Sequence, residues 1–258
     1  MELIHHRFDS ISSTNDWAKE QIAFFQRDKV TIVSADSQTS GRGQYGRSWL
    51  SSSKENIYIS FCFFISEGQN DPLSLTHLMA IAVAQLLEEE QLVPQIKWPN
   101  DVLIDGKKIA GILCETVPVE NMIGVIIGVG LNVNMTAEML ALIGRPATSL
   151  AIEKLTLRNN DGLKSERGKA GSKQSDPNEE AIALCYGQRK RIDPATPQPL
   201  SNPSLLHKVS ENDQPYDKTV VAKRLEELFI TALEEFLKRG FTPFLPTFRR
   251  LVFKNYCG

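Results

Sequence analysis

A two-residue turn near the middle of the chain constrains the fold more than any other feature. Residues 102–104 and 107–113 are rich in aliphatic side chains, and Asp105-Gly106 stands between them. Asp-Gly between two such runs is the strongest short signal for a β-hairpin. A third apolar run follows at residues 123–134, where glycines are costly unless another group must approach the backbone closely. The sequence therefore predicts neighbouring strands within one sheet.

Helices are expected to alternate with these strands. Ser13 and Thr14 can cap a first helix, a proline begins the second, and the third is an amphipathic helix that Arg239-Gly240 ends. The expected helices cover residues 13–25, 71–90 and 218–237, and further strands are expected at 30–33 and 56–64. Strands and helices in this order predict an α/β (α+β) fold, a mixed β-sheet flanked by helices.

Composition argues against several functional classes. The 258 residues are 41% hydrophobic and 23% charged, as in ordinary globular enzymes, and the net charge of −2 argues against a protein that coats nucleic acid. Four scattered cysteines without a C-x-x-C pair favour a reducing cytoplasm over a disulfide framework or a zinc site. We see neither a secretory signal nor a membrane span. His5-His6 is interpreted as a solvated pair and not as a metal site, because adjacent residues point to opposite sides of a strand. A cytoplasmic protein is expected.

The character of the sequence changes at residues 154–216. This stretch is polar, charged and rich in glycine and proline, and it shows no clear periodic element. Because so long a segment does not fit as a loop inside a compact domain, we predict a flexible polar insertion. The charge run at residues 188–191 is interpreted as solvated rather than as a nucleic-acid patch. Residues 1–153 and 217–250 are then expected to form one domain.

A loop rich in glycine and arginine follows the strand expected at residues 30–33. Gly41, Gly43 and Gly46 allow the backbone to turn tightly and to approach a ligand closely. Arg42 and Arg47 carry guanidinium groups that pair with carboxylates or phosphates through two parallel hydrogen bonds. Together with Lys97 and Lys107-Lys108 downstream, these residues favour an anionic ligand, and a nucleotide above all.

The same loop matches the G-x-G-x-x-G pattern of dinucleotide-binding folds, but its surroundings do not. That pattern requires a helix directly after the loop, and residues 47–53 are too rich in serine to begin one. An acidic residue at the end of a second strand, about twenty positions further on, is also missing. The P-loop pattern does not occur anywhere in the chain. We therefore reject the dinucleotide interpretation.

Several motifs, taken together and in order, resemble those of biotin protein ligases. They include Ser13-Thr14-Asn15 before a helix, Gln38, the loop at residues 41–49, Lys97-Trp98-Pro99-Asn100-Asp101, and the runs at 106–115 and 128–132. The resemblance implies a catalytic domain like those of biotin ligases and class II aminoacyl-tRNA synthetases. It covers nearly all of residues 5–153 and returns at about 217–250.

The resemblance also implies an activity, biotin–[acetyl-CoA-carboxylase] ligation, with biotin and ATP as substrates. The biotin carboxylate attacks the α-phosphate of ATP to give biotinyl-5′-AMP, and a lysine of a carboxylase biotin carrier domain then takes the biotin. Mg²⁺ would neutralise the pyrophosphate leaving group. Fixed cations lower the barrier between two anions, and the resemblance assigns that catalytic role to Arg42, Lys97 and Lys108.

Binding roles follow from the same resemblance. It places Ser13, Thr14 and Gln38 at the ureido ring of biotin, Gly111 beside the biotin tail, and Trp49 and Asn132 in the adenylate half. The remaining expected binding residues lie in the same motifs: Asn15, Gly41, Gly43, Gln44, Asn100 and Asp101. Three alternatives stay open: Ser13-Thr14 as a plain helix cap, Trp98 as a core residue, and Asp101 as an ion-pair partner that orients Lys97.

The chain departs from the family at two places. Gln44 stands where many members have a second arginine, which implies a weaker hold on the adenylate. We expect the C-terminal SH3-like module to be absent or truncated, and we expect no winged-helix domain and no DNA binding. A monomer and a homodimer both remain possible. Alternative functions are a lipoate- or octanoate-type ligase or transferase, and a noncatalytic biotin-binding protein.

Overall fold

The computed structural model describes residues 1–51, 55–66, 72–167 and 216–253. The chain divides into two compact units, which are Met1–Leu155 with Gln214–Gly258, and Thr156–Asp213. The first unit holds the sheet and every site residue expected from the sequence. In the second unit the described residues are the later turns of helix α4 (Leu150–Arg167).

Helix α4 corrects part of the expected insertion. We expect no regular element from residue 154 onward, yet the helix continues to Arg167. The run from Asn159 to Gly162 suggests a loop, but each such residue costs a helix only about 0.5–1 kcal/mol relative to alanine. Leucine, lysine, arginine and glutamate around it favour the helix and outweigh that cost. The rest of the expected insertion up to residue 215, including residues 188–191, lies outside the described residues.

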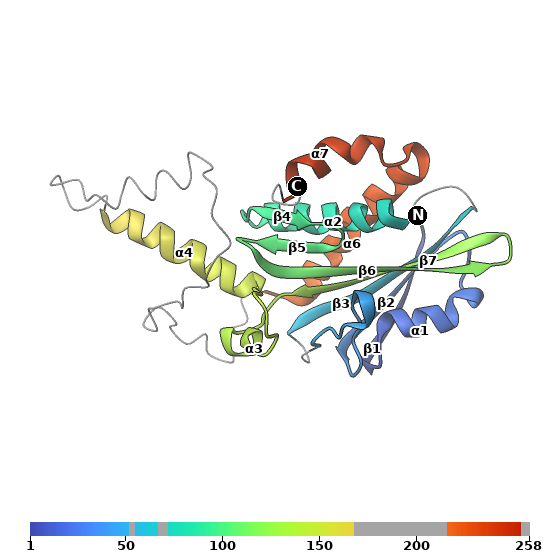
Figure 1. Cartoon of the computed structure of the whole chain (residues 1–258), viewed down its shortest axis with the longest axis horizontal. Coiled ribbons are helices and arrows are strands. Elements are labelled where there is room, and N and C mark those ends of the chain that lie inside the picture. The colour runs from blue at the N-terminus through green and yellow to red at the C-terminus, as the bar shows by residue number, and fades with distance from the viewer. Residues whose placement is uncertain (52–54, 67–71, 168–215, 254–258) are drawn as a thin grey trace. The chain divides into compact units, whose positions relative to one another are not determined.

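In the described part of the chain, seven strands form one mixed sheet in the order β1-β2-β3-β7-β6-β5-β4 (Figure 1). Strands β1 and β2 are parallel, and the other neighbouring pairs are antiparallel. The strands are β1 (Leu3–Ile11), β2 (Val30–Gln38), β3 (Asn56–Ser66), β4 (Pro94–Lys97), β5 (Asp101–Ile104), β6 (Lys107–Val119) and β7 (Met122–Asn132). The predicted fold class is confirmed.

The helices lie on both faces of this sheet. The α-helices besides α4 are α1 (Thr14–Gln21), α2 (Pro72–Glu89), α3 (Ala137–Ala141), α6 (Lys218–Arg239) and α7 (Leu245–Leu251). Short 3₁₀ turns are η1 (Ile22–Phe24), η2 (Gln44–Gly46) and η4 (Thr242–Phe244). None of the helices in the described ranges combines the length and the apolar character that crossing a bilayer requires.

The predicted hairpin is confirmed. Ile104 of β5 pairs with Lys107 of β6, which leaves Asp105 and Gly106 as a two-residue turn. Their φ angles are 47° and 75°, and a type I′ turn requires such positive values at both positions. The turn closes β5 onto β6 and so places Asp101 and Lys108 on neighbouring strands.

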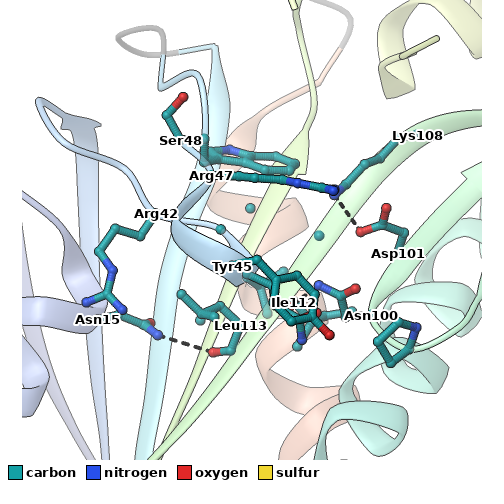
Figure 2. A pocket seen from close by; sticks show the side chains of 18 of the residues that line it. Asn15, Arg42, Tyr45, Arg47, Ser48, Asn100, Asp101, Lys108, Ile112 and Leu113 are labelled. Carbon is teal, nitrogen blue, oxygen red and sulfur yellow. Dashed lines mark hydrogen bonds and ion pairs between the residues drawn. The ribbon is translucent and has the colours of Figure 1, made fainter. Parts of the chain in front are cut away.

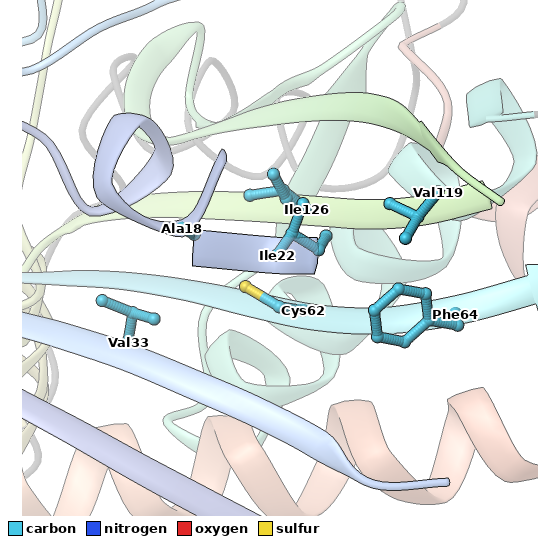
Figure 3. Packing of buried hydrophobic residues seen from close by; sticks show 7 residues of the cluster. All are labelled: Ala18, Ile22, Val33, Cys62, Phe64, Val119 and Ile126. Carbon is cyan, nitrogen blue, oxygen red and sulfur yellow. The ribbon is translucent and has the colours of Figure 1, made fainter. Parts of the chain in front are cut away.

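Strand β3 is buried on both faces and separates two packing layers. Phe61 and Phe63 face α6, where the Phe61 ring lies 4.8 Å from that of Phe229. Because side chains alternate along a strand, Cys62 and Phe64 point to the opposite face, toward α1. There they form an apolar cluster with Ala18, Ile22, Val33, Val119 and Ile126 (Figure 3). The functional site lies on this α1 face.

Strand β1 is the main element that the sequence pattern does not reveal. Its alternation is weak, since His5, His6 and Arg7 interrupt it, and its pairing with β2 brings it into the sheet. His5 and His6 do diverge: His5 lies 3.1 Å from Glu226 of α6, whereas the His6 ring lies 5.1 Å from that of Trp17. His6 is therefore packed against an aromatic side chain, so the interpretation of a solvated pair is wrong for it.

Candidate active site

A cavity of about 180 Å³ opens on the α1 face of the sheet (Figure 2). Its wall comes from four places: the N-terminus of α1, the glycine loop around η2, the turn between β4 and β5, and the facing parts of β6 and β7. These segments are far apart in the sequence, and the strand order of the sheet brings them together.

Most of the residues that the sequence predicts for the site line this cavity. They are Ser13, Thr14, Asn15, Gln38, Arg42, Gly43, Gln44, Trp49, Lys97, Asn100, Asp101, Lys108 and Gly111. Gly41 and Asn132 instead line a second cavity of about 810 Å³. The two cavities share Trp49 and Lys108, so these side chains lie where the cavities adjoin.

Glycines on β6 and β7 form the floor of the site. A Cβ atom on Gly128 would lie 2.2 Å from Oδ1 of Asn15, and one on Gly130 would lie 2.4 Å from the Trp49 indole. Gly111, which pairs with Gly130 across the sheet, would place a Cβ 2.8 Å from the same indole. The close approach that the sequence predicts for these glycines is therefore made by side chains of α1 and the glycine loop.

The start of α1 serves both as a helix cap and as a wall of the cavity. The Ser13 hydroxyl accepts from the backbone N–H of Asp16 at 3.3 Å, which is an N-cap bond. The backbone N–H of Thr14 donates to Oε1 of Gln38 at 2.8 Å, and Gln38 donates to Ser51 at 3.1 Å. The capping interpretation is confirmed, and it coexists with a position beside the cavity.

Asn15 uses its whole amide within the protein. Its Nδ2 donates to the Leu113 carbonyl at 3.2 Å and to Glu115 at 3.0 Å, and its Oδ1 accepts from Ser60 at 2.6 Å. With 3% of its surface exposed, Asn15 ties α1 to β3 and β6 at the edge of the cavity. The bond to Leu113 is drawn in Figure 2.

The Arg42 guanidinium is held by two carboxylates. Its Nη1 donates to Asp16, and its Nη2 donates to Glu115 at 2.7 Å. Glu115 also pairs with Lys19 at 3.4 Å. Burial raises the pKa of Glu115, but its hydrogen bonds with Asn15 and Arg42 and the nearby positive charges outweigh burial and lower that pKa. Any ligand that reaches Arg42 therefore meets a guanidinium that already has two anionic partners.

Lys108 lies largely buried between an acid and an aromatic ring. Its Nζ donates to Asp101, and the same nitrogen lies 5.1 Å from the centroid of the Trp49 ring. Burial lowers the pKa of Lys108 most strongly, and the charges of Arg145 and Arg47 add to this effect against the opposing pull of Asp101. Asp101 thus forms an ion pair with Lys108 across the β5–β6 hairpin.

Asn132 and Asn100 also make structural bonds. The Asn132 amide donates to the Thr148 carbonyl at 3.0 Å, which holds the segment that borders the second cavity. The Asn100 amide donates to the Ile112 carbonyl at 2.9 Å, and the Ile112 N–H donates back to the Asn100 carbonyl at 2.9 Å. These bonds fix the β4–β5 turn against β6.

Comparison with known proteins agrees with this architecture. The model of the Biotin/lipoate A/B protein ligase family matches residues 7–132, which include every site residue expected from the sequence. The matched segment is slightly less than half of the chain, and it resembles this family. Its resemblance to biotin protein ligases in particular is also confirmed by individual relatives of this ligase family.

Two relatives illustrate the similarity. The bifunctional ligase/repressor BirA of Bacillus subtilis is 42% identical over 134 residues, which are 51% of this chain and 40% of that protein. The biotin–[acetyl-CoA-carboxylase] ligase of Mycobacterium tuberculosis is 36% identical over 116 residues, 43% of this chain and 42% of that protein. The chain thus spans about two fifths of the length of these two curated relatives.

A solved structure shows the same fold. The biotin protein ligase from Aquifex aeolicus in complex with biotin and ATP superposes with a TM-score of 0.60 at 22% identity. The superposition covers 96% of this chain and 78% of that chain. The mixed sheet and its flanking helices therefore share the fold of that structure.

The tertiary structure adds residues to the ligase-family site that the sequence does not identify. Arg145 lines both cavities and helps to lower the pKa of Lys108, and Glu115 holds Arg42 from β6. The signal for Arg145 is weak, a single arginine between glycine and proline. The core interpretation of Trp98 is wrong: its side chain lines the first cavity and is 55% exposed, because the β4–β5 turn points it away from the sheet.

We expect Glu115→Gln to loosen the glycine loop. Glutamine keeps a hydrogen-bond acceptor for Asn15 but removes the charge that holds Arg42, and a partly buried charged hydrogen bond contributes about 1–2 kcal/mol. Urea unfolding measures the lost stability, and limited proteolysis reports cleavage in the loop. Glu120→Gln is the control, since Glu120 pairs with Arg27 at an exposed position. Equal behaviour of the two variants would contradict the prediction.

Proposed function

We propose that this chain is an ATP-dependent biotin protein ligase. It forms biotinyl-5′-AMP from biotin and ATP and then transfers biotin to a lysine of a carboxylase biotin carrier domain. The observation that carries the proposal is the gathering of Arg42, Lys97 and Lys108 around a cavity whose floor is made of glycines. The match of residues 7–132 to the ligase-family model supports it.

The two adjoining cavities suit two substrates. In this proposal biotin occupies the first cavity, and the adenosine of ATP occupies the larger second one, bordered by Asn132 and by the segment around Arg145. The carboxylate and the α-phosphate then meet at the junction, beside Lys108 and Trp49. A buried ammonium there stabilises the charge that develops on phosphorus without first having to shed much water.

The binding residues take the roles that the family resemblance implies. Ser13, Thr14 and Gln38 hydrogen-bond the ureido ring, and the biotin tail passes near Gly111 of β6, beside the Trp49 indole that packs on this glycine. Arg42 and Lys97 orient the carboxylate, whose approach to a second anion they make less unfavourable. These polar groups fit the assignment because they lie together at the cavity wall. The backbone N–H and the hydroxyl of Thr14 both donate to Oε1 of Gln38.

The residues that the structure describes do not by themselves offer a Mg²⁺ cage. Within the described ranges, no three His, Cys, Asp or Glu side chains gather as ligands for a metal ion. In this proposal Mg²⁺ enters with the phosphates of ATP and neutralises part of their charge.

We assign the reaction to the domain formed by residues 1–153 and 217–250. All cavity-lining residues lie in the first compact unit, which supports this assignment. The acceptor is the lysine of a biotin carboxyl carrier domain.

A two-stage assay tests the proposal. The purified protein should release pyrophosphate when both ATP and biotin are present, and lipoate or octanoate in place of biotin should give little release. It should then biotinylate a biotin carrier domain but not a carrier whose acceptor lysine is arginine. Release with lipoate instead of biotin would identify a lipoate-type ligase, and binding of biotin without any pyrophosphate would indicate a noncatalytic protein.

A further inference from the structure

Two exposed aromatic side chains stand at the entrance of the first cavity. Tyr45 is 87% exposed and Trp98 is 55% exposed, and both line the cavity. A side chain that lines a cavity while most of its surface faces solvent lies at the rim. Figure 2 labels Tyr45 among the residues that line the cavity.

The backbone conformation of Tyr45 is strained, which points to a functional role for this residue. Its φ of 57° lies in the left-handed region, which is unfavourable for a bulky residue by about 1–2 kcal/mol. Within the described residues the Tyr45 ring stacks on no other ring, so packing of that ring does not offset the strain. Backbone strain of this kind concentrates at sites of function.

Trp98 is held outward by its neighbours. The reciprocal bonds between Asn100 and Ile112 fix the turn on which Trp98 lies, and Lys97 and Asp101 on either side of the turn line the cavity. An indole fixed in solvent beside a charged cavity exposes apolar surface that folding alone does not require. Tyrosine and tryptophan are the side chains that most often anchor a protein partner.

We propose that Tyr45 and Trp98 form a docking rim for the acceptor protein, an inference that rests on the proposed function. The acceptor's ε-amine must pass this rim to reach the acyl carbon of biotinyl-5′-AMP. Its nitrogen forms the amide bond, the bond from the acyl carbon to the phosphate oxygen breaks, AMP leaves with that oxygen, and the amine releases a proton to solvent. The residues next to the acceptor lysine then contact the two rings, and apolar side chains fit there best.

The test separates the two half-reactions. Tyr45→Ala and Trp98→Ala should each raise the KM for a biotin carrier domain by about tenfold, because each removes an anchor of the interface. Biotin-dependent exchange of pyrophosphate into ATP needs no acceptor and should stay within about twofold of the wild type. Reaction of the adenylate with hydroxylamine, a nucleophile too small to need docking, should also be unchanged. Tyr45→Phe and Trp98→Phe should restore the KM.

Phe24→Ala is the matched control, since Phe24 is an aromatic residue that is 81% exposed and does not line the cavity. It should leave the KM for the carrier unchanged. An unchanged KM in both rim variants, or a parallel loss of exchange and hydroxylamine reaction, would overturn the docking rim while leaving the ligase intact. Absence of exchange in the wild type would overturn the proposed function and the rim with it.

Discussion

Replacing Lys108 with methionine should slow biotin-dependent pyrophosphate release by about 100-fold, because one preorganised charge at a reacting centre contributes roughly 3 kcal/mol. Lys108 is buried at the junction of the two cavities, beside Asp101 and the Trp49 ring. Methionine has a similar length and no charge, so the variant removes the cation without opening a large void. A change concentrated in kcat, with the KM for biotin little altered, would mark an interaction made mainly in the transition state.

Lys107→Met is the matched control for this experiment. Lys107 is the neighbouring residue, and its Nζ pairs with Glu153 at 3.4 Å. Lys107 is not among the residues that line the two cavities. Pyrophosphate release should remain close to that of the wild type. Similar losses in the two variants would show that β6 was disturbed and that the role assigned to Lys108 is wrong.

The pH profile gives the same prediction a second readout. Only the charged ammonium stabilises the phosphate, so its contribution is complete below the pKa of Lys108 and is lost as pH rises through it. Burial places that pKa below the usual lysine value, so the alkaline loss of rate should begin earlier than for an exposed lysine. Lys108→Arg should move the loss to higher pH, because a guanidinium does not deprotonate in this range.

Gly128→Ala should destabilise the protein by about 2 kcal/mol, because the added methyl group overpacks a buried polar contact. Its Cβ would lie 2.2 Å from Oδ1 of Asn15, and Asn15 cannot move without losing its bonds to Ser60, Leu113 and Glu115. Urea unfolding measures the change in the free energy of unfolding. Thermal unfolding should show a lower Tm as well.

Two further variants separate this clash from a general effect of adding a methyl group. In Gly43→Ala the new Cβ would meet nothing nearer than 3.4 Å, so its stability should hardly change. The double variant Asn15→Ala/Gly128→Ala removes the clashing oxygen, and it should be more stable than the sum of the two single changes predicts. Additive losses would mean that Gly128 and Asn15 do not compete for space.

Local patterns were enough for much of the fold. The Asp105-Gly106 turn was predictable because two adjacent residues with positive φ suffice to define it. Helix α6 was predictable because its apolar stripe and the glycine at its C-terminus lie within one segment. Strand β1 was not, because its polar middle shows little alternation and its place depends on pairing with β2.

The candidate site likewise has residues that the local sequence predicts and contacts that it does not. Its glycines, arginines and lysines occur in short motifs, so the cations and the close-approach positions could be named before the structure was known. The side chains that control them come from distant segments: Arg42 and Glu115 are 73 residues apart, and Asn15 and Glu115 are 100 apart. Such pairs depend on which strands are neighbours in the sheet, and residue spacing does not encode that.

By itself, then, the sequence determined the type of sheet, the hairpin that carries Lys108, and the chemical groups of the site. Only the tertiary structure decided that Arg42 is held by two acids, that Lys108 pairs with Asp101, and that Trp98 faces solvent. The physical reason is the separation along the chain over which each effect acts. Backbone preferences act over a few residues, whereas burial and charge pairing depend on side chains that meet only after the strands have taken their order.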